Sequence, residues 1–153
     1  MGYTNLEQSE TLKGILPPDS ADMKWYFRKD EIDAPKVPTF GYSKAAAESY
    51  KGTEAVYLPC WSLDALIKLL PSEFTTENKF GIFKYTIRIR KYKFTEDIDV
   101  HQIAYGNYKY YEDGSSSWKD MINTGEKEEL LDAAFDMICW LHKQNLFNYE
   151  NSK

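Results

Sequence analysis

A short helix whose two ends are both marked in the sequence constrains this chain most. Residues 58–71 read LPCWSLDALIKLLP, and Ser62 can accept hydrogen bonds from the first backbone N–H groups of a helix. Asp64 suits the positive end of the helix dipole, and Pro71 ends the helix because it lacks a backbone N–H. We therefore expect a helix over 62–70, which is scaffold and carries no chemistry. Its buried face would comprise Leu63, Leu66, Ile67 and Leu70.

The clearest strand pattern lies at residues 80–94. Apolar and polar side chains alternate along it, with Phe83, Tyr85, Ile87 and Ile89 on one face and Lys84, Thr86, Arg88 and Arg90 on the other. Such alternation predicts a strand with one face in the core and the other in water. Tyr92 and Phe94 fall on the polar face, so we expect a bulge near Lys91 or the end of regular pairing there.

Two more helices are expected near the two ends of the chain. Thr4 and Glu7 have the spacing of a capping box, and a helix that begins there must end before Pro17. Thr124 can cap a helix over 126–145. Glutamates crowd the first turn of this helix, where they suit the positive end of the dipole. Its apolar face would comprise Leu130, Leu131, Ala134, Phe135, Ile138 and Leu141.

Shorter strands complete the expected sheet. The aromatic-rich residues 23–29 and the residues 54–58 each predict one strand. Residues 101–111 and 115–121 flank a turn in which Gly114 can take the positive φ of a hairpin. The chain is therefore expected to be α+β, with an antiparallel sheet of about five strands and about three helices packed mainly on one face.

The 153 residues fit a single domain over 1–153, because a chain of this length can bury about two thirds of its unfolded surface. Residues 30–53 interrupt the pattern with prolines, glycines and a run of three alanines at 45–47. We expect a long surface excursion there, with one helical turn around 45–49. Loops of this length usually serve a function, so the excursion is a candidate contact surface.

Charge and cysteine content narrow the class of protein. The formal net charge is −5, and an acidic domain lacks the global attraction to phosphate that most nucleic-acid-binding proteins use. Cys60 and Cys139 each lie in an apolar stretch, which favours buried free thiols, with a disulfide as the alternative. The sequence shows no secretory start and no apolar run that could span a bilayer. We therefore expect a cytoplasmic protein without membrane contact.

The familiar catalytic and metal-binding motifs are absent from the sequence. His101 and His142 are the two histidines, and neither has a Cys, Asp or Glu partner at metal-ligand spacing. There is no Gly-x-Ser-x-Gly elbow, no phosphate-cradling glycine loop and no His-Glu-x-x-His motif. We expect no catalytic residue, cofactor or metal, although carboxylates from distant segments could still assemble a catalytic pair.

The strand at 84–93 gives the sharpest local signal for a ligand. Its cations are Lys84, Arg88, Arg90, Lys91 and Lys93, with Tyr85 and Tyr92 between them and Phe94 directly after. Cations beside aromatic rings can hold a nucleic-acid strand by phosphate contact and base stacking. The other interpretation is a solvated face whose charges pair with Glu or Asp on neighbouring strands. We favour the second, because the domain is acidic and Tyr85 falls on the core face.

Three blocks of the chain resemble a known group of sequences. They are YTNLEQS at 3–9 with ILP at 15–17 and DSADM at 19–23, PCWSL through LLP at 59–71, and DAAFDMI at 132–138. Together they resemble small uncharacterised proteins of prophages and conjugative elements in gut Bacteroidales, while 30–53 and 95–123 have no counterpart. The resemblance implies an accessory gene product of mobile DNA and brings no assigned activity or functional residue.

These observations favour a non-enzymatic accessory protein of a mobile genetic element that binds an unknown protein partner. The alternative is a nucleic-acid-binding module that uses the basic strand at 84–93, and an unrecognised enzyme is the third interpretation. Salt-dependent retention on nucleic acid separates the first two. A deep pocket with converging carboxylates would favour the third.

Overall fold

The computed structural model describes residues 2–31 and 36–146. Their structure contains four α-helices and two antiparallel sheets, which confirms the α+β class. The sheets hold three and four strands, in place of the single sheet that the sequence predicted. The chain divides into two compact units, of which the first ends at Leu69 and the second begins at Leu70. Part of the expected surface excursion, residues 32–35, lies outside the described residues.

The first unit contains a three-stranded sheet in the order β2-β1-β3. Its elements are α1 (Leu6–Lys13), the 3₁₀ helix η1 (Pro18–Ser20), β1 (Met23–Arg28), β2 (Thr39–Phe40), α2 (Lys44–Ser49), β3 (Ala55–Cys60) and α3 (Leu63–Leu69). The helical turn expected around 45–49 is α2. A buried cluster between β1 and β3 forms the core, and it consists of Met23, Trp25, Leu58 and Cys60.

The N-terminus of α1 differs from the prediction because Thr4 is buried and has other partners. The Asn5 side chain accepts a hydrogen bond from the backbone N–H of Gln8 at 2.7 Å, and the Gln8 side chain accepts one from the Asn5 N–H at 3.0 Å. The capping box expected from Thr4 and Glu7 is therefore wrong. The Thr4 hydroxyl instead accepts from the backbone N–H of Trp61 at 3.1 Å, which ties the start of the chain to the end of β3.

The helix expected after Ser62 is confirmed as α3. The Ser62 hydroxyl accepts a hydrogen bond from the backbone N–H of Ala65 at 3.1 Å and donates one to the Asp22 carboxylate at 2.5 Å. The buried side chains of α3 are Leu66 and Leu69, while Leu63 and Ile67 are half-buried. The expected burial of the last two is therefore only partial, and Leu69 takes a place in the core that the pattern did not assign.

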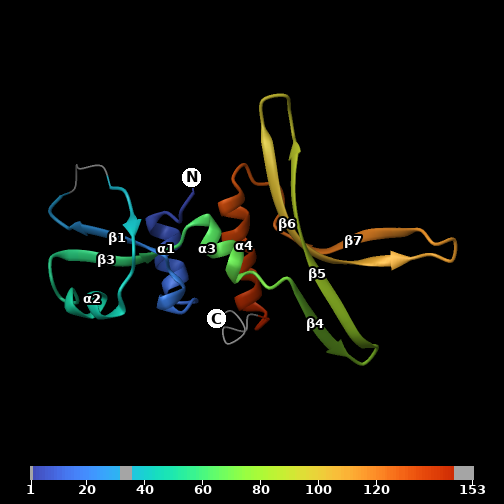
Figure 1. Cartoon of the computed structure of the whole chain (residues 1–153), viewed down its shortest axis with the longest axis horizontal. Helices are drawn as coiled ribbons and strands as arrows, with labels where there is room; N and C mark the ends of the chain where they lie inside the picture. Colours follow the sequence, from blue (N-terminus) through green and yellow to red (C-terminus); the bar gives the residue numbers. More distant parts are fainter. Residues whose placement is uncertain (1, 32–35, 147–153) are drawn as a thin grey trace. The chain divides into compact units, whose positions relative to one another are not determined.

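The second unit contains a four-stranded sheet in the order β4-β5-β6-β7. Its elements are β4 (Glu73–Asn78), β5 (Gly81–Lys93), β6 (Asp99–Tyr110), β7 (Ser116–Asn123) and α4 (Leu130–Lys143). The turn between β6 and β7 confirms the expected hairpin, and Gly114 there has a φ of 85°. Figure 1 shows this sheet as three hairpin arms that diverge from the paired middle of β5 and β6.

The register explains why the arms diverge. β5 pairs with β4 over residues 81–86 and with β6 over residues 86–93. The last residues of β6, 107–110, pair with β7 alone. β5 and β6 therefore separate beyond the pair Thr86 and Gly106, and the sheet forks at this point (Figure 1). We call the gap between residues 81–85 of β5 and 107–110 of β6 the fork.

The pairing of β5 with β6 is regular as far as Lys93, where β5 ends. The bulge expected near Lys91 is therefore wrong, and the alternative, an end of regular pairing, occurs two residues later. The irregularity lies between β6 and β7 instead, where the register shifts between Tyr105 and Gly106. An extra residue on β7 at this position turns the β6–β7 arm away from β5, since a bulge bends its strand and increases the local twist.

The apolar face of β5 is less buried than its alternation predicted. Ile89 is 43% exposed and Phe83 is also exposed, whereas Ile103 and Tyr105 of β6 are fully buried. α4 packs on β6, and Phe83 lies on the part of β5 that extends past β6. The prediction that Ile89 and Phe83 belong to the core is therefore wrong, and Ile87 is half-buried.

α4 begins at Leu130, later than the start at 126 that the sequence predicted, and its N-cap residue Glu129 makes no side-chain capping hydrogen bond. Thr124 does not cap the helix, because its hydroxyl accepts the backbone N–H of Ile103 at 3.1 Å and continues the pairing along β6. The buried side chains of α4 are Leu131, Ala133, Ala134, Met137, Ile138 and Leu141. Phe135, expected in the core, is half-buried.

Candidate binding surface on the forked sheet

The lysines of the basic strand lie on β5 and have acidic partners on neighbouring strands. Lys84 Nζ lies 2.9 Å from a carboxylate oxygen of Glu73 on β4. Lys91 Nζ and Lys93 Nζ each lie 3.4 Å from a carboxylate oxygen of Asp99 on β6. Their positive charges, that of Lys93 foremost, hold the pKa of Asp99 below its ordinary value. The expected pairing with neighbouring acids is confirmed for these three lysines, which leaves less free positive charge for phosphate.

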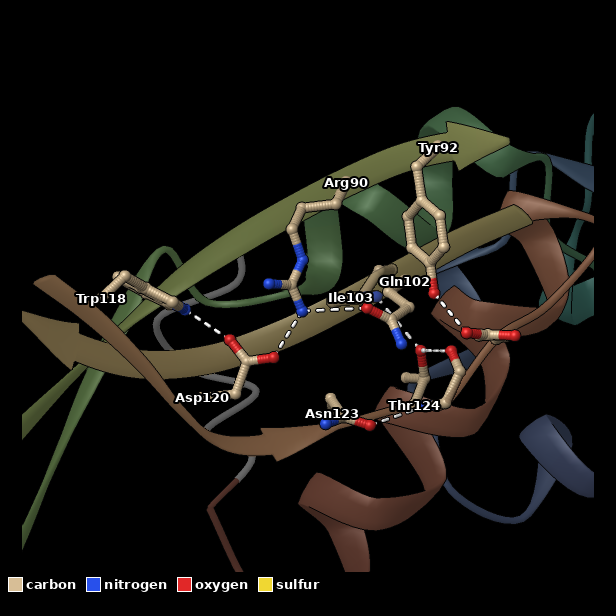
Figure 2. A network of polar contacts seen from close by, with 10 residues as sticks. Arg90, Tyr92, Gln102, Ile103, Trp118, Asp120, Asn123 and Thr124 are labelled. Atoms are coloured by element: carbon tan, nitrogen blue, oxygen red, sulfur yellow. Dashed lines mark hydrogen bonds and ion pairs between the residues drawn. The ribbon is translucent and has the colours of Figure 1, made fainter. Parts of the chain in front are cut away.

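Arg90 is the centre of a polar network on one face of the sheet (Figure 2). Its guanidinium donates to Gln102 Oε1 at 2.9 Å and to the carboxylate of Asp120 on β7, and the same carboxylate accepts from the indole N–H of Trp118. Burial disfavours the ionised carboxylate, yet these two hydrogen bonds and the arginine charge hold the pKa of Asp120 below its ordinary value. Arg90 therefore links β5, β6 and β7 next to the fork. Both N–H groups of its Nη2 already have acceptors, so Nη2 cannot donate to a ligand oxygen.

Arg88 has an aromatic partner. Its guanidinium carbon lies 5.4 Å from the centroid of the Trp118 ring, which is the geometry of a cation–π contact. Trp118 also contacts the Tyr108 ring, whose centroid lies 5.1 Å from its own, and Gly106, where a Cβ would come within 2.8 Å of the indole. Trp118 is thus fixed by its hydrogen bond to Asp120, by Arg88 and by the glycine backbone at the branch point of the fork.

A groove of about 680 Å³ occupies the fork. Its walls comprise Ile82, Phe83, Lys84, Asn107, Tyr108, Lys109, Tyr111, Ser117, Trp118 and Lys119. Alternate residues of a strand project to opposite faces of a sheet, and the register places Ile82, Tyr108 and Trp118 on one face and Phe83, Lys109 and Lys119 on the other. Because both faces contribute to its walls, the groove is a gap in the plane of the sheet and not a hollow on one face.

The charge of this groove is opposite in sign to the net charge of the chain. Three lysines line it and no acidic side chain does. Lys84 has its partner in Glu73, while Lys109 Nζ lies over the ring of Tyr111 at 5.6 Å. The groove is therefore a basic, aromatic-walled site on a protein with a net charge of −5.

Large apolar side chains are exposed along the three arms. Within the described residues of the second unit they are Phe80, Ile82, Phe83, Ile89, Tyr92, Phe94, Ile98, Tyr108, Tyr110, Tyr111 and Met121. Phe80 and Tyr110 are each 77% exposed, and Ile82 is 70% exposed. Single exposed apolar residues are ordinary, whereas a large apolar patch is typical of interaction sites. Of this set, Ile82, Phe83, Tyr108 and Tyr111 line the groove.

The first unit has a cavity of its own, of about 370 Å³, beside a cluster of tyrosines. The Tyr57 ring centroid lies 5.4 Å from those of Tyr42 and Tyr50, and the Tyr57 hydroxyl accepts from the backbone N–H of Ser43 at 2.9 Å. Its charged walls are mixed, with Lys13, Lys29, Lys44 and Lys51 beside Glu10 and Glu48. The rings of Tyr42 and Tyr50 hold the described part of the excursion against Tyr57 of β3, while its Val37 and Phe40 are exposed. Because the walls of this cavity carry charges of both signs, the excursion is a weaker candidate contact surface than the fork.

The remaining chemical candidates give no site. Within the described part of the chain, no group of three or more His, Cys, Asp or Glu residues is placed to hold a metal ion. His101 pairs through its backbone with Lys127. Cys60 and Cys139 are free thiols, and burial raises the pKa of both. No helix among the described residues is long and apolar enough to cross a membrane.

Sequence reasoning found the cations of β5 but missed the aromatic walls of the fork. Tyr110 and Tyr111 directly precede the Glu-Asp-Gly turn, and Phe80 and Ile82 lie beside the tight turn at Gly81. Large apolar residues next to a turn are the available signal, because a hairpin end is seldom covered by another element. Trp118 could not be assigned from its position, since its place beside the fork depends on the register of β7.

Comparison of the chain with protein-family models, with curated proteins and with solved structures gives no match.

Proposed function

We propose that this chain is a protein-binding module that engages its partner through the forked sheet of the second unit. One observation carries the proposal: large apolar side chains are exposed on three hairpin arms around a groove with aromatic walls. Tyrosine and tryptophan are enriched at protein interfaces, and polar residues form the rim of such sites. Since Lys84, Lys91 and Lys93 already have acidic partners, a protein is favoured over nucleic acid as the ligand.

The biological setting in this proposal follows from the sequence resemblance. The chain would be a non-enzymatic accessory protein of a mobile element in gut Bacteroidales, acting in the cytoplasm. The absence of the familiar catalytic motifs from the sequence supports a role without catalysis.

The test is affinity capture with variants of the arm ends. The immobilised protein is incubated with a lysate of cells that carry its gene, in parallel with a triple variant Phe80→Ser, Ile82→Ser and Tyr110→Ser. We expect a protein that is retained by the wild type and lost by the triple variant, because the removed side chains supply the apolar contact area. Capture that survives the triple variant would overturn the proposal.

Phe40→Ser is the matched control, because Phe40 is as exposed as the arm residues but lies on β2 in the first unit. It should leave the capture unchanged. Retention of single-stranded nucleic acid at physiological salt is measured with the same samples. Tight, strongly salt-dependent retention that depends on Arg88 would replace the protein-binding proposal with nucleic-acid binding.

A further inference from the structure

β5 has an unpaired inner edge at the fork. In an antiparallel ladder, successive residues of a strand direct their backbone N–H and C=O groups alternately to the two sides. The Ile87 N–H donates to the Ser72 carbonyl on the β4 side at 2.9 Å, so Ile82 and Lys84, which have the opposite parity, direct theirs to the β6 side. Pairing with β6 stops at Thr86. The backbone groups of Ile82 and Lys84 therefore open into the fork.

β6 has a matching inner edge across the fork. The His101 N–H donates to Lys127 and the Tyr111 N–H to Ser115, both on the β7 side. Tyr108 and Tyr110 have the opposite parity and direct their backbone groups to the side of β5, which has already separated. The fork is thus bounded by two edges, each of which presents alternating donors and acceptors to solvent.

We infer that a partner protein adds an extended segment as a β-strand in the fork, with acidic and apolar residues alternating along it. The inference rests on the proposed function and names the recognition mode. The free edges span 81–85 of β5 and 107–110 of β6, which is close to the ordinary strand length of about five residues. In strand addition the backbone hydrogen bonds give affinity and the alternate side chains give specificity.

The two faces of the fork differ, and the difference specifies the alternation. On one face an added strand meets Ile82, Tyr108 and Trp118, which suit apolar side chains. Lys84 lies on the same face, but Glu73 already pairs with its charge. On the other face it meets Lys109 and Lys119, which suit carboxylates, beside the ring of Phe83. Because successive side chains of a strand alternate between faces, apolar residues at every second position and acidic residues between them satisfy both.

The charge and the edges favour this occupant over the other candidates. A single-stranded nucleic acid would use the lysines and the rings but not the alternating backbone groups. A second copy of this chain could offer the glutamates of its β4, Glu73 and Glu77, but Glu73 is already paired with Lys84 of its own β5. Both remain outcomes of the experiment below.

The probe is a synthetic peptide of about nine residues, with blocked ends, in which glutamate and valine alternate; this length spans one free edge. Amide hydrogen exchange is followed by NMR in the full chain. Without peptide, the amides of Ile82 and Lys84 should exchange faster than those of Phe83 and Tyr85, whose N–H groups bond to β4. With peptide, the fast amides should become protected. The same peptide with lysine in place of glutamate should bind at least about tenfold more weakly.

Proline substitutions separate the backbone edge from the side chains. Lys84→Pro removes one N–H from the fork, and Thr75→Pro removes the N–H directly opposite it in the register, which faces away from β5 on the outer edge of β4. We expect Lys84→Pro to weaken peptide binding about tenfold and Thr75→Pro to leave it unchanged. Lys84→Ala, which keeps the N–H, measures the part due to charge. Circular dichroism and the exchange pattern of α4 verify that each variant is folded.

Each outcome decides a different statement. Equal weakening by Lys84→Pro and Lys84→Ala, or loss of binding in Thr75→Pro alone, would overturn strand addition in the fork. Protection of the same amides at rising protein concentration, without peptide, would replace the acidic segment with a second copy of the chain, and protection by a single-stranded oligonucleotide would replace it with nucleic acid. If the captured partner depends on the arm ends but not on Lys84→Pro, protein binding holds and strand addition falls.

Discussion

Gly106 of β6 lies directly against Trp118 of β7, so that a Cβ on Gly106 would stand 2.8 Å from the indole ring and closer still to the carbonyl oxygen of Lys119. Neither neighbour can yield easily, because one is backbone and the other is held by Arg88 and Asp120. We expect Gly106→Ala to lower the free energy of unfolding by about 1–3 kcal/mol, as overpacking does. Urea denaturation followed by circular dichroism measures it.

Gly2→Ala is the control for this prediction. A Cβ on Gly2 would have no atom within 4 Å, so its free energy of unfolding should equal that of the wild type. If the two substitutions cost the same, the close approach of Gly106 and Trp118 does not determine the packing of the β6–β7 arm.

The two kinds of ion pair on β5 should differ in their contribution to stability. Asp120→Ala removes the acceptor that the Arg90 guanidinium and the Trp118 N–H share in a partly buried place and leaves Arg90 only Gln102. We expect a loss of about 1–3 kcal/mol in the free energy of unfolding. Glu73→Ala removes the exposed partner of Lys84 and should cost less than about 1 kcal/mol. The free energies of unfolding of both variants, measured side by side, give the comparison. An equal or larger loss in Glu73→Ala would contradict it.

The two thiols should react at different rates with a thiol reagent under native conditions. Cys60 is fully buried in the core of the first unit, whereas Cys139 is partly exposed on α4. Burial raises the pKa of both thiols and so lowers the fraction of reactive thiolate. We expect Cys139 to label first and Cys60 to label at the rate of unfolding. Cys139→Ser assigns the fast phase, and a fast phase that persists in this variant would show that Cys60 is accessible.

The core of α4 gives a prediction in which the structure corrects the sequence. Phe135 and Ile138 belong to the same apolar stripe, but Ile138 is fully buried and Phe135 only half-buried. Ile138→Ala should therefore lower the free energy of unfolding by about 2–5 kcal/mol. Phe135→Ala should lower it by less than Ile138→Ala does, although phenylalanine is the larger side chain. Thermal denaturation of the two variants checks the order.

Local features of the fold could be predicted from the sequence, because they depend on a few neighbouring residues. The cap at Ser62, the alternation of β5 and the turn at Gly114 are all of this kind. The pattern could not show how far each strand has a neighbour. Alternation along β5 states which side chains share a face, but the separation of β5 from β6 at Thr86 is set by pairing with β4 and β7.

The candidate site could likewise be predicted from the sequence only in part. The acidic partners of Lys84, Lys91 and Lys93 could be expected, since an acidic domain supplies carboxylates on adjacent strands. The fork could not, because it consists of backbone edges and of residues 80–84 and 107–119 brought together by the register. Thr4 illustrates the general difficulty: its spacing to Glu7 is that of a capping box, yet contact with Trp61 across the unit takes its hydroxyl away.

The stability of the second unit should fall in acid through Asp120. Because hydrogen bonds from Trp118 and Arg90 lower its pKa in the folded state, its carboxylate stabilises the fold at any pH above the ordinary aspartate pKa of about 3.9. This contribution is lost as the pH falls through the lower folded-state value, since the unfolded chain then binds the proton more readily. We expect the difference in free energy of unfolding between the wild type and Asp120→Asn to be largest near neutral pH and to shrink at pH values below about 4.

Gln102→Ala is the control for this prediction, because it removes another hydrogen bond of Arg90 without removing a titrating group. Its difference from the wild type in free energy of unfolding should stay constant over the same pH range. If the difference in free energy of unfolding between the wild type and Asp120→Asn is equally constant with pH, the charge of this carboxylate does not stabilise the network.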